Sequence, residues 1–108
     1  MDVQLSDENG ITIAKVEGEI NISTSPALKK EFEKIETANV VINLELVGYV
    51  DSSGLATLVE VLKKVRAKGG ALHLTHLSDK VVSLFEITKL DKLFGIFSND
   101  EDAISNFK

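Results

Sequence analysis

The sequence has no cysteine and no tryptophan, and it contains one proline, one tyrosine and two histidines. Without cysteine the chain has no disulfide framework and no thiolate site for a metal or for redox chemistry. Its 12 basic residues against 17 acidic ones give a formal net charge of -5, the wrong sign for binding nucleic acid phosphates. No uncharged apolar run approaches the roughly 18 residues of a membrane span, and the first ten residues do not resemble a signal peptide. We therefore expect a cytoplasmic protein that neither inserts into a membrane nor has nucleic acid as its main partner.

The length and the composition are those of a folded domain. The chain has 108 residues, of which 44% are hydrophobic and 27% charged. A chain of this length buries roughly 65% of its unfolded surface around one core. No linker, repeat or low-complexity tract divides the sequence, so we expect residues 1–108 to form a single domain.

The spacing of apolar residues predicts strands and helices in alternation. Alternating residues over 3–16 predict a hairpin with Ile11, Ile13 and Val16 on one face. Short apolar runs predict strands at 40–44, 71–74 and 95–97. Helices are expected after an N-cap at Ser25, from the serine pair to Gly69-Gly70, through 82–87, and after a cap at Ser98 or Asn99. His73 is expected on the solvent side of its strand.

The resulting order is ββαβαβαβα. Strands that alternate with helices call for a mixed, largely parallel sheet. Functional loops in such sheets gather at the carboxyl ends of the strands. Two segments lie there in this sequence: residues 18–24 before the first helix and residues 48–54 before the second.

The second of these segments contains two adjacent serines, Ser52 and Ser53, directly after Asp51. Serine is a preferred helix cap, a possible nucleophile and a possible phosphate acceptor. A nucleophile needs a base, and His76 is the histidine that could approach Ser52 from a neighbouring loop. The G-x-S-x-G elbow and the P-loop are both absent, and His73-x-x-His76 puts its two rings on opposite faces of a strand. We predict no catalytic residue, cofactor or metal site.

The sequence resembles the anti-sigma-factor antagonist family, the STAS-domain proteins of bacterial partner-switching systems. The resemblance covers nearly the whole chain and is carried by GEINISTSPALKKEF, by VVINLELVGYVDSSGLATLVEVLKKVRAKGGALHL and by the late LFEITKLDKLFGIF. Its most specific part is D-S-S-G-L at the start of a helix. It implies a STAS-like fold and a regulatory protein that is not an enzyme.

The resemblance also implies a function for the serine pair. Ser52 would be phosphorylated by a serine kinase that is itself the anti-sigma factor, and a separate serine phosphatase would remove the phosphate. The unphosphorylated domain, a monomer when free, would bind the kinase and thereby release the sigma factor for transcription. We expect Ser53 to cap the helix while Ser52 is presented to the partner. The expected partner-binding residues are Asn21, Ile22, Ser23, Thr24, Tyr49, Asp51, Ser52, Ser53 and Gly54.

One residue departs from the family pattern. The family's loop commonly reads G-E-L-D, whereas this chain has Gly18-Glu19-Ile20-Asn21, so an amide replaces a carboxylate at Asn21. The change preserves hydrogen bonding and removes one negative charge.

The alternative function is a STAS scaffold or an accessory subunit of a transporter in which Ser52 is not modified.

Overall fold

The computed structural model describes residues 1–107 and contains the nine predicted strands and helices in the predicted order. The strands are β1 (Asp2–Glu8), β2 (Ile11–Glu17), β3 (Asn39–Leu46), β4 (Leu72–Thr75) and β5 (Gly95–Phe97). The helices are α1 (Ser25–Glu33), α2 (Ser52–Ala67), α3 (Asp79–Ile87) and α4 (Asp100–Ser105). A short 3-10 helix, η1 (Leu90–Lys92), follows α3. None of the helices within residues 1–107 is long and apolar enough to cross a lipid bilayer.

The five strands form one sheet in the order β1-β2-β3-β4-β5. β1 and β2 are antiparallel and are joined by a two-residue turn, Asn9-Gly10, in which both residues have positive φ. Asn-Gly is the favoured pair for such a turn because both residues tolerate this conformation. The other neighbouring strands are parallel. The predicted mixed, largely parallel sheet is therefore confirmed.

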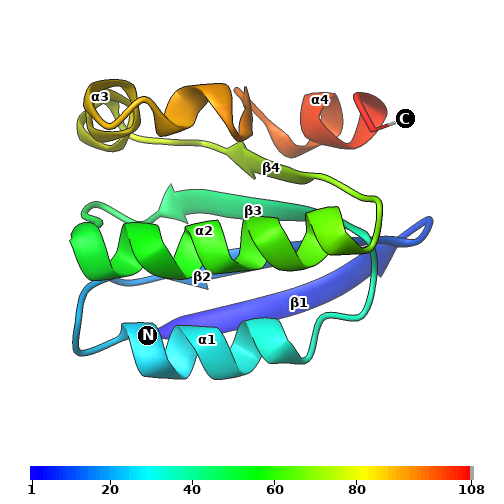
Figure 1. Ribbon diagram of the computed structural model, residues 1–108, viewed down its shortest axis with the longest axis horizontal. Coiled ribbons are helices and arrows are strands. Elements are labelled where there is room, and N and C mark those ends of the chain that lie inside the picture. Colours follow the sequence, from blue (N-terminus) through cyan, green and yellow to red (C-terminus); the bar gives the residue numbers. More distant parts are fainter. Residues whose placement is uncertain (108) are drawn as a thin grey trace.

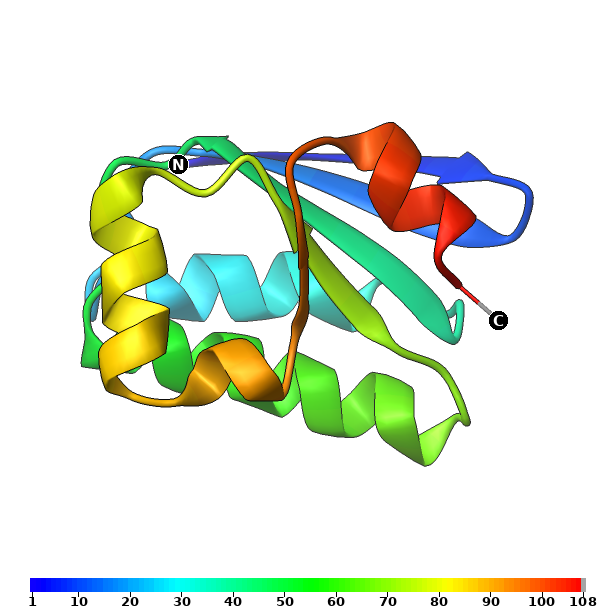
Figure 2. The same cartoon turned by 90° about the horizontal axis from the view of Figure 1, so that it is seen from above.

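The helices cover the two faces of the sheet unequally (Figures 1 and 2). α1 and α2 lie on one face, α4 lies on the other, and α3 lies at one end of the molecule. Along β3, Val40, Ile42 and Leu44 belong to the large core on the α1 and α2 face, whereas Val41 belongs to a small cluster with Ala103 of α4. This alternation is the period-two pattern of a strand that is buried on both faces.

Two expectations about the faces of strands are wrong. Ile11 and Ile13 share the α4 face, but Val16 lies in the main core with Ala14 because it is an odd number of residues away from both isoleucines. His73 is not on a solvent face: only 7% of it is exposed. Its Nδ1–H donates to the carbonyl oxygen of Ala103 at 2.9 Å, and its ring stacks on Phe107 with centroids 3.9 Å apart. α4 therefore covers this part of β4.

Helix termini also differ from the expectations in detail. Thr24, not Ser25, is the N-cap residue of α1, and Ser25 is its first helical residue, with its hydroxyl donating to Asn21 O at 2.7 Å. Asn99 caps α4 as expected, with its side chain accepting from Asp102 N at 2.8 Å. The predicted helix over 82–87 begins earlier, at Asp79, and it buries Val81 and Phe85, whereas Ile87 is 79% exposed.

Candidate functional site

The two loops predicted to carry function lie side by side at the carboxyl ends of β2 and β3. Ile20 and Val50 form a parallel bridge, in which Ile20 N donates to Tyr49 O and Asp51 N donates to Ile20 O, both at 3.0 Å. Both apolar side chains are buried, with 0% and 2% exposed. The bridge extends the pairing of β2 with β3 past the strands themselves, so the loops have a common, buried base.

Gly54 allows the start of α2 to pack closely against this base. A Cβ atom at Gly54 would lie 2.5 Å from Cγ2 of Ile20 and 2.9 Å from both Ile20 O and Cγ1 of Val50. Contacts this short do not occur in folded proteins, and two of the three neighbouring atoms are buried methyl carbons. Any larger residue at position 54 would push α2 away from the loops. Gly54 was predicted to bind the partner, but it is buried. It therefore affects the site through the packing of α2 against the loops.

Asp51 caps α2. Its backbone is extended, and its Oδ1 accepts a hydrogen bond from Gly54 N at 2.9 Å. A carboxylate at this position satisfies a free N–H and also complements the positive end of the helix dipole. The expectation that Ser53 is the cap is therefore wrong, because the residue before the serine pair has that role.

Ser52 is the first residue of α2 and is exposed, whereas Ser53 is half-buried. The two serines differ because successive residues of a helix point about 100° apart, so one can face solvent while the next faces its neighbours. The carbonyl oxygen of Ser53 accepts from Thr57 Oγ1 at 3.1 Å, one turn further along α2. Ser52 has the accessibility that a phosphate acceptor requires.

The loop before α1 has a fixed shape of its own. Asn21 Oδ1 accepts hydrogen bonds from Ser23 N at 2.9 Å and from Thr24 N at 3.1 Å. Thr24 Oγ1 in turn donates to Glu19 O at 2.8 Å and accepts from Asn21 N at 2.9 Å. An aspartate at position 21 could accept the same two N–H bonds, so the amide of Asn21 preserves the turn while removing a charge from the loop.

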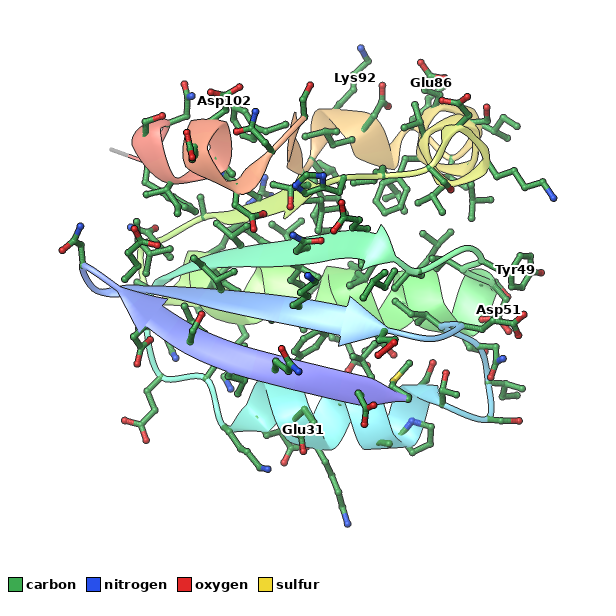
Figure 3. The ribbon with its side chains drawn as sticks, turned by 180° about the vertical axis from the view of Figure 1, so that it is seen from behind. Glu31, Tyr49, Asp51, Glu86, Lys92 and Asp102 are labelled. Atoms are coloured by element: carbon green, nitrogen blue, oxygen red, sulfur yellow. The ribbon has the colours of Figure 1, made fainter. Side chains whose placement is uncertain are left out.

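Two apolar side chains are exposed beside the serine. Ile22 is 73% exposed and Tyr49 is 52% exposed. They come from different loops, and Asp51 lies between these loops, since its carboxylate also accepts from Ile22 N. Figure 3 shows Tyr49 and Asp51 together at the end of the molecule beyond the arrowheads of β2 and β3. Exposed apolar groups around an exposed hydroxyl are typical of a surface that binds another protein.

Residues of α3 complete the site and were missed in the sequence analysis. A hollow of about 460 Å³ is lined by Tyr49, Asp51 and Ser52 on one side and by Lys80 and Leu84 of α3 and its C-cap residue Thr88 on the other. Ile87 is at helical spacing from Lys80 and Leu84 and extends this face of α3. The carboxyl end of β4 leads into α3, so the rule that selected the other two loops also applies to this third segment.

His76 does not line the hollow that contains Ser52. Its Nδ1 lies 3.9 Å from Glu45 Oε2, and it lines a different hollow, with Leu77, Ile96 and Ser98. The proposed approach of His76 to Ser52 is therefore not found in the structure. His73 is held beneath α4, away from the exposed hydroxyl.

The comparisons with known proteins agree with one another. The STAS domain family model matches residues 2–103. The anti-sigma-B factor antagonist of Bacillus subtilis (strain 168) is 33% identical over 100 residues, which cover 91% of each chain. The crystal structure of an anti-sigma factor antagonist from Mycobacterium paratuberculosis is 25% identical and has a TM-score of 0.87, covering 96% of this chain and 91% of that one.

A third similar protein is a Bacillus cell fate determinant, SpoIIAA, in its phosphorylated form. It is 17% identical, covers 96% of this chain and 97% of that one, and has a TM-score of 0.74. At this identity the likeness concerns the fold. The family model and the B. subtilis relative both span more than nine-tenths of the chain, which therefore belongs to the STAS-domain family of anti-sigma factor antagonists.

Proposed function

We propose that this protein is an anti-sigma factor antagonist that is switched by phosphorylation of Ser52. The unphosphorylated form binds an anti-sigma factor serine kinase in the cytoplasm and so frees a sigma factor for transcription. The phosphorylated form is released, and a serine phosphatase restores the binding form. The observation that carries the proposal is the exposed Ser52 at the start of α2, surrounded by the exposed Ile22 and Tyr49.

The position of Ser52 explains how the domain could accept a phosphate without unfolding. Phosphorylation adds about -1.5 to -2 charges and three strong acceptor oxygens. The N-terminus of a helix favours an anion, by roughly 0.3 to 1 kcal/mol at an exposed site. The fold of SpoIIAA, which this chain shares, has been determined in a phosphorylated form. We expect the phosphorylated domain to retain its fold.

A bound partner would experience the same phosphate very differently. A protein that covers Ile22 and Tyr49 would also cover Ser52, so the phosphate would be buried beside the carboxylate of Asp51. Burying an uncompensated charge costs several kcal/mol. Since each 1.4 kcal/mol corresponds to a factor of ten in affinity, a cost of roughly 3 to 4 kcal/mol would lower the affinity by two to three orders of magnitude.

The proposed binding surface has three parts. The loop before α1 contributes Asn21, Ile22, Ser23 and Thr24, and the loop before α2 contributes Tyr49 and Asp51 with the helix start at Ser52, Ser53 and Gly54. To these we add the face of α3 with Lys80, Leu84 and Ile87. The hollow between Tyr49 and Leu84 would accept an apolar side chain of the kinase, and Lys80 at its rim would favour an acidic group. The free domain, residues 1–108, would be a monomer in this scheme.

Binding by Ser52 variants tests the proposal. The Ser52→Ala protein should retain the kinase in the presence of ATP, and mass spectrometry should identify the recovered protein as a kinase. When wild-type protein is incubated with this kinase, mass spectrometry should find phosphate on Ser52. The Ser52→Asp protein should bind the same kinase at least tenfold more weakly, although Asp supplies only one of the charges of a phosphate. Ser6→Asp is the matched control, because Ser6 is an exposed serine on β1 outside the site.

Equal binding by wild type and Ser52→Asp would contradict the charge mechanism. An unmodified Ser52 in cells under every growth condition, together with a bound transporter or scaffold protein, would favour the alternative function, a STAS subunit that is not phosphorylated. Turnover of a substrate that disappears in Ser52→Ala would instead indicate an enzyme.

A further inference from the structure

Asp51 connects two parts of the site that are far apart in the sequence. Its Oδ1 accepts from Gly54 N at 2.9 Å, and its Oδ2 accepts from Ile22 N at 3.1 Å. One side chain thus joins the start of α2 to a loop 29 residues earlier. The two bonds use different oxygens, so they can be broken separately.

The bond to Ile22 has a function that capping alone does not require. Helix capping is satisfied by the bond to Gly54. The bonds of Asn21 and Thr24 fix the internal shape of the loop. They do not connect the loop to α2, whereas the Asp51–Ile22 bond does. Ile22 is 73% exposed, so its side chain has little packing of its own to keep it in place.

We propose that Asp51 is a positioning residue for partner binding, which holds Ile22 at a fixed place beside Ser52. The inference rests on the proposed function and deepens it. A hydrogen bond to a carboxylate is stronger than one between neutral groups. A loop held in its bound conformation loses less entropy when a partner covers it, so the bond should increase the affinity of the complex.

The same bond connects phosphorylation to the loop. A phosphate on Ser52 lies next to Asp51 in the sequence and repels its carboxylate. This repulsion weakens the hold of Asp51 on Ile22. Phosphorylation would then act twice, by placing charge at the interface and by releasing an apolar contact residue.

The variant Asp51→Asn separates the two bonds of Asp51. Asn is as good a helix cap as Asp, so its oxygen can still accept from Gly54 N. Its other group is an NH₂, which cannot accept from Ile22 N. The matched control is Asp79→Asn, which removes one charge from the exposed first residue of α3.

The first measurement is amide hydrogen exchange of the protein alone. We expect Ile22 N–H to exchange at least tenfold faster in Asp51→Asn and in protein phosphorylated on Ser52, because a hydrogen bond to a charged group contributes more than about 1.4 kcal/mol. Amides of β3 should be unchanged, which shows that the variant is folded, and Asp79→Asn should match wild type. Unchanged exchange at Ile22 in Asp51→Asn would overturn the inference.

The second measurement is a double-mutant cycle with the kinase recovered with Ser52→Ala. Asp51→Asn should weaken binding at least threefold, and it should weaken binding much less when Ile22 is already replaced by alanine. Additive losses would overturn the positioning role, since a purely structural cap would act independently of Ile22. Failure of wild type to bind any serine kinase would refute the proposed function, while the exchange measurement would still decide whether Asp51 holds Ile22.

Discussion

The two faces of the sheet are held by different kinds of interaction. The face covered by α1 and α2 is a continuous apolar core that includes Leu28, Ile42 and Leu58, each with 0% exposed. The face covered by α4 has few buried apolar residues but three buried polar ones, Asn43, His73 and Thr75. Burial of apolar area is not directional, whereas hydrogen bonds require partners at fixed positions. The first face is therefore stabilised mainly by the amount of apolar area that it buries. The second depends on hydrogen bonds between residues at fixed positions.

Hydrogen bonds at two positions attach α4 to the sheet. The carboxylate of Asp100 accepts from Thr75 Oγ1 at 2.5 Å and from Asn43 Nδ2 at 3.0 Å, so it connects the first turn of α4 to β4 and β3. About one turn further along the helix, Ala103 O accepts from His73 Nδ1. Two points of attachment fix a helix of six residues that is too short to be stable alone. In Figure 3 the labelled Asp102 marks this helix on the near face of the sheet.

The largest expected effect is in the apolar core. Leu58→Ala removes a fully buried side chain of α2 from the contacts with the sheet. We expect the free energy of unfolding to fall by about 2 to 5 kcal/mol, because the transfer free energy is lost and a cavity remains. Urea denaturation measures the change. A loss below about 1 kcal/mol would mean that this face tolerates defects as well as the surface does.

An intermediate effect is expected at the polar attachment of α4. Asp100→Ala leaves two buried donors, Thr75 Oγ1 and Asn43 Nδ2, without their acceptor. We expect this change to lower the free energy of unfolding by about 1 to 3 kcal/mol. The control Glu101→Ala removes an exposed carboxylate from the same helical turn. If both variants unfold at the same urea concentration, the hydrogen bonds of Asp100 do not distinguish this face from the surface.

The smallest effect concerns pH. Burial lowers the pKa of His73 from its ordinary value of 6.5, and the hydrogen bond to Ala103 opposes this only in part. The unfolded chain therefore binds a proton at a higher pH than the native protein. The stability from neutral His73 is fully present above about pH 6.5 and is lost as the pH falls from there towards the native pKa.

His73→Phe isolates this contribution, because it retains a flat ring against Phe107 and removes the titrating group. The urea concentration at the unfolding midpoint should decrease more between pH 7.5 and pH 5.5 in wild type than in the variant. Parallel decreases in the two proteins would show that the titration of His73 does not affect the stability of the α4 face.

This asymmetry explains which parts of the fold could be predicted from sequence. Residues of the core face recur at regular spacing in the sequence, as Leu58, Leu62 and Val65 of α2 do. The strands and helices could therefore be predicted in the correct order. The other face depends on contacts between single polar residues far apart in the chain. Nothing in the sequence around His73 indicates that Ala103 and Phe107 cover it, and its burial was missed for this reason.

The site was predicted in the same uneven way. The two loops were found because they follow parallel strands, and Ser52 is exposed as expected. The choice of cap among Asp51, Ser52 and Ser53 could not be made locally, since all three residue types cap helices well. The bridge between Ile20 and Val50 decides it, because it fixes where the chain enters α2. The segment that enters α3 follows the parallel strand β4, so the same rule would have included it, whereas the position of Leu84 on the hollow beside Ser52 is visible only in the structure.

The strand order has a consequence for how the protein acquires its structure. Because the order in space repeats the order along the chain, each strand pairs with the strand that precedes it in sequence. This order lets the sheet grow at one edge while the chain emerges from the ribosome. The Ile20–Val50 junction can form once the chain has passed α2, whereas α4 attaches last. The two loops of the candidate site would thus take shape early during synthesis, on a sheet whose second face is still open.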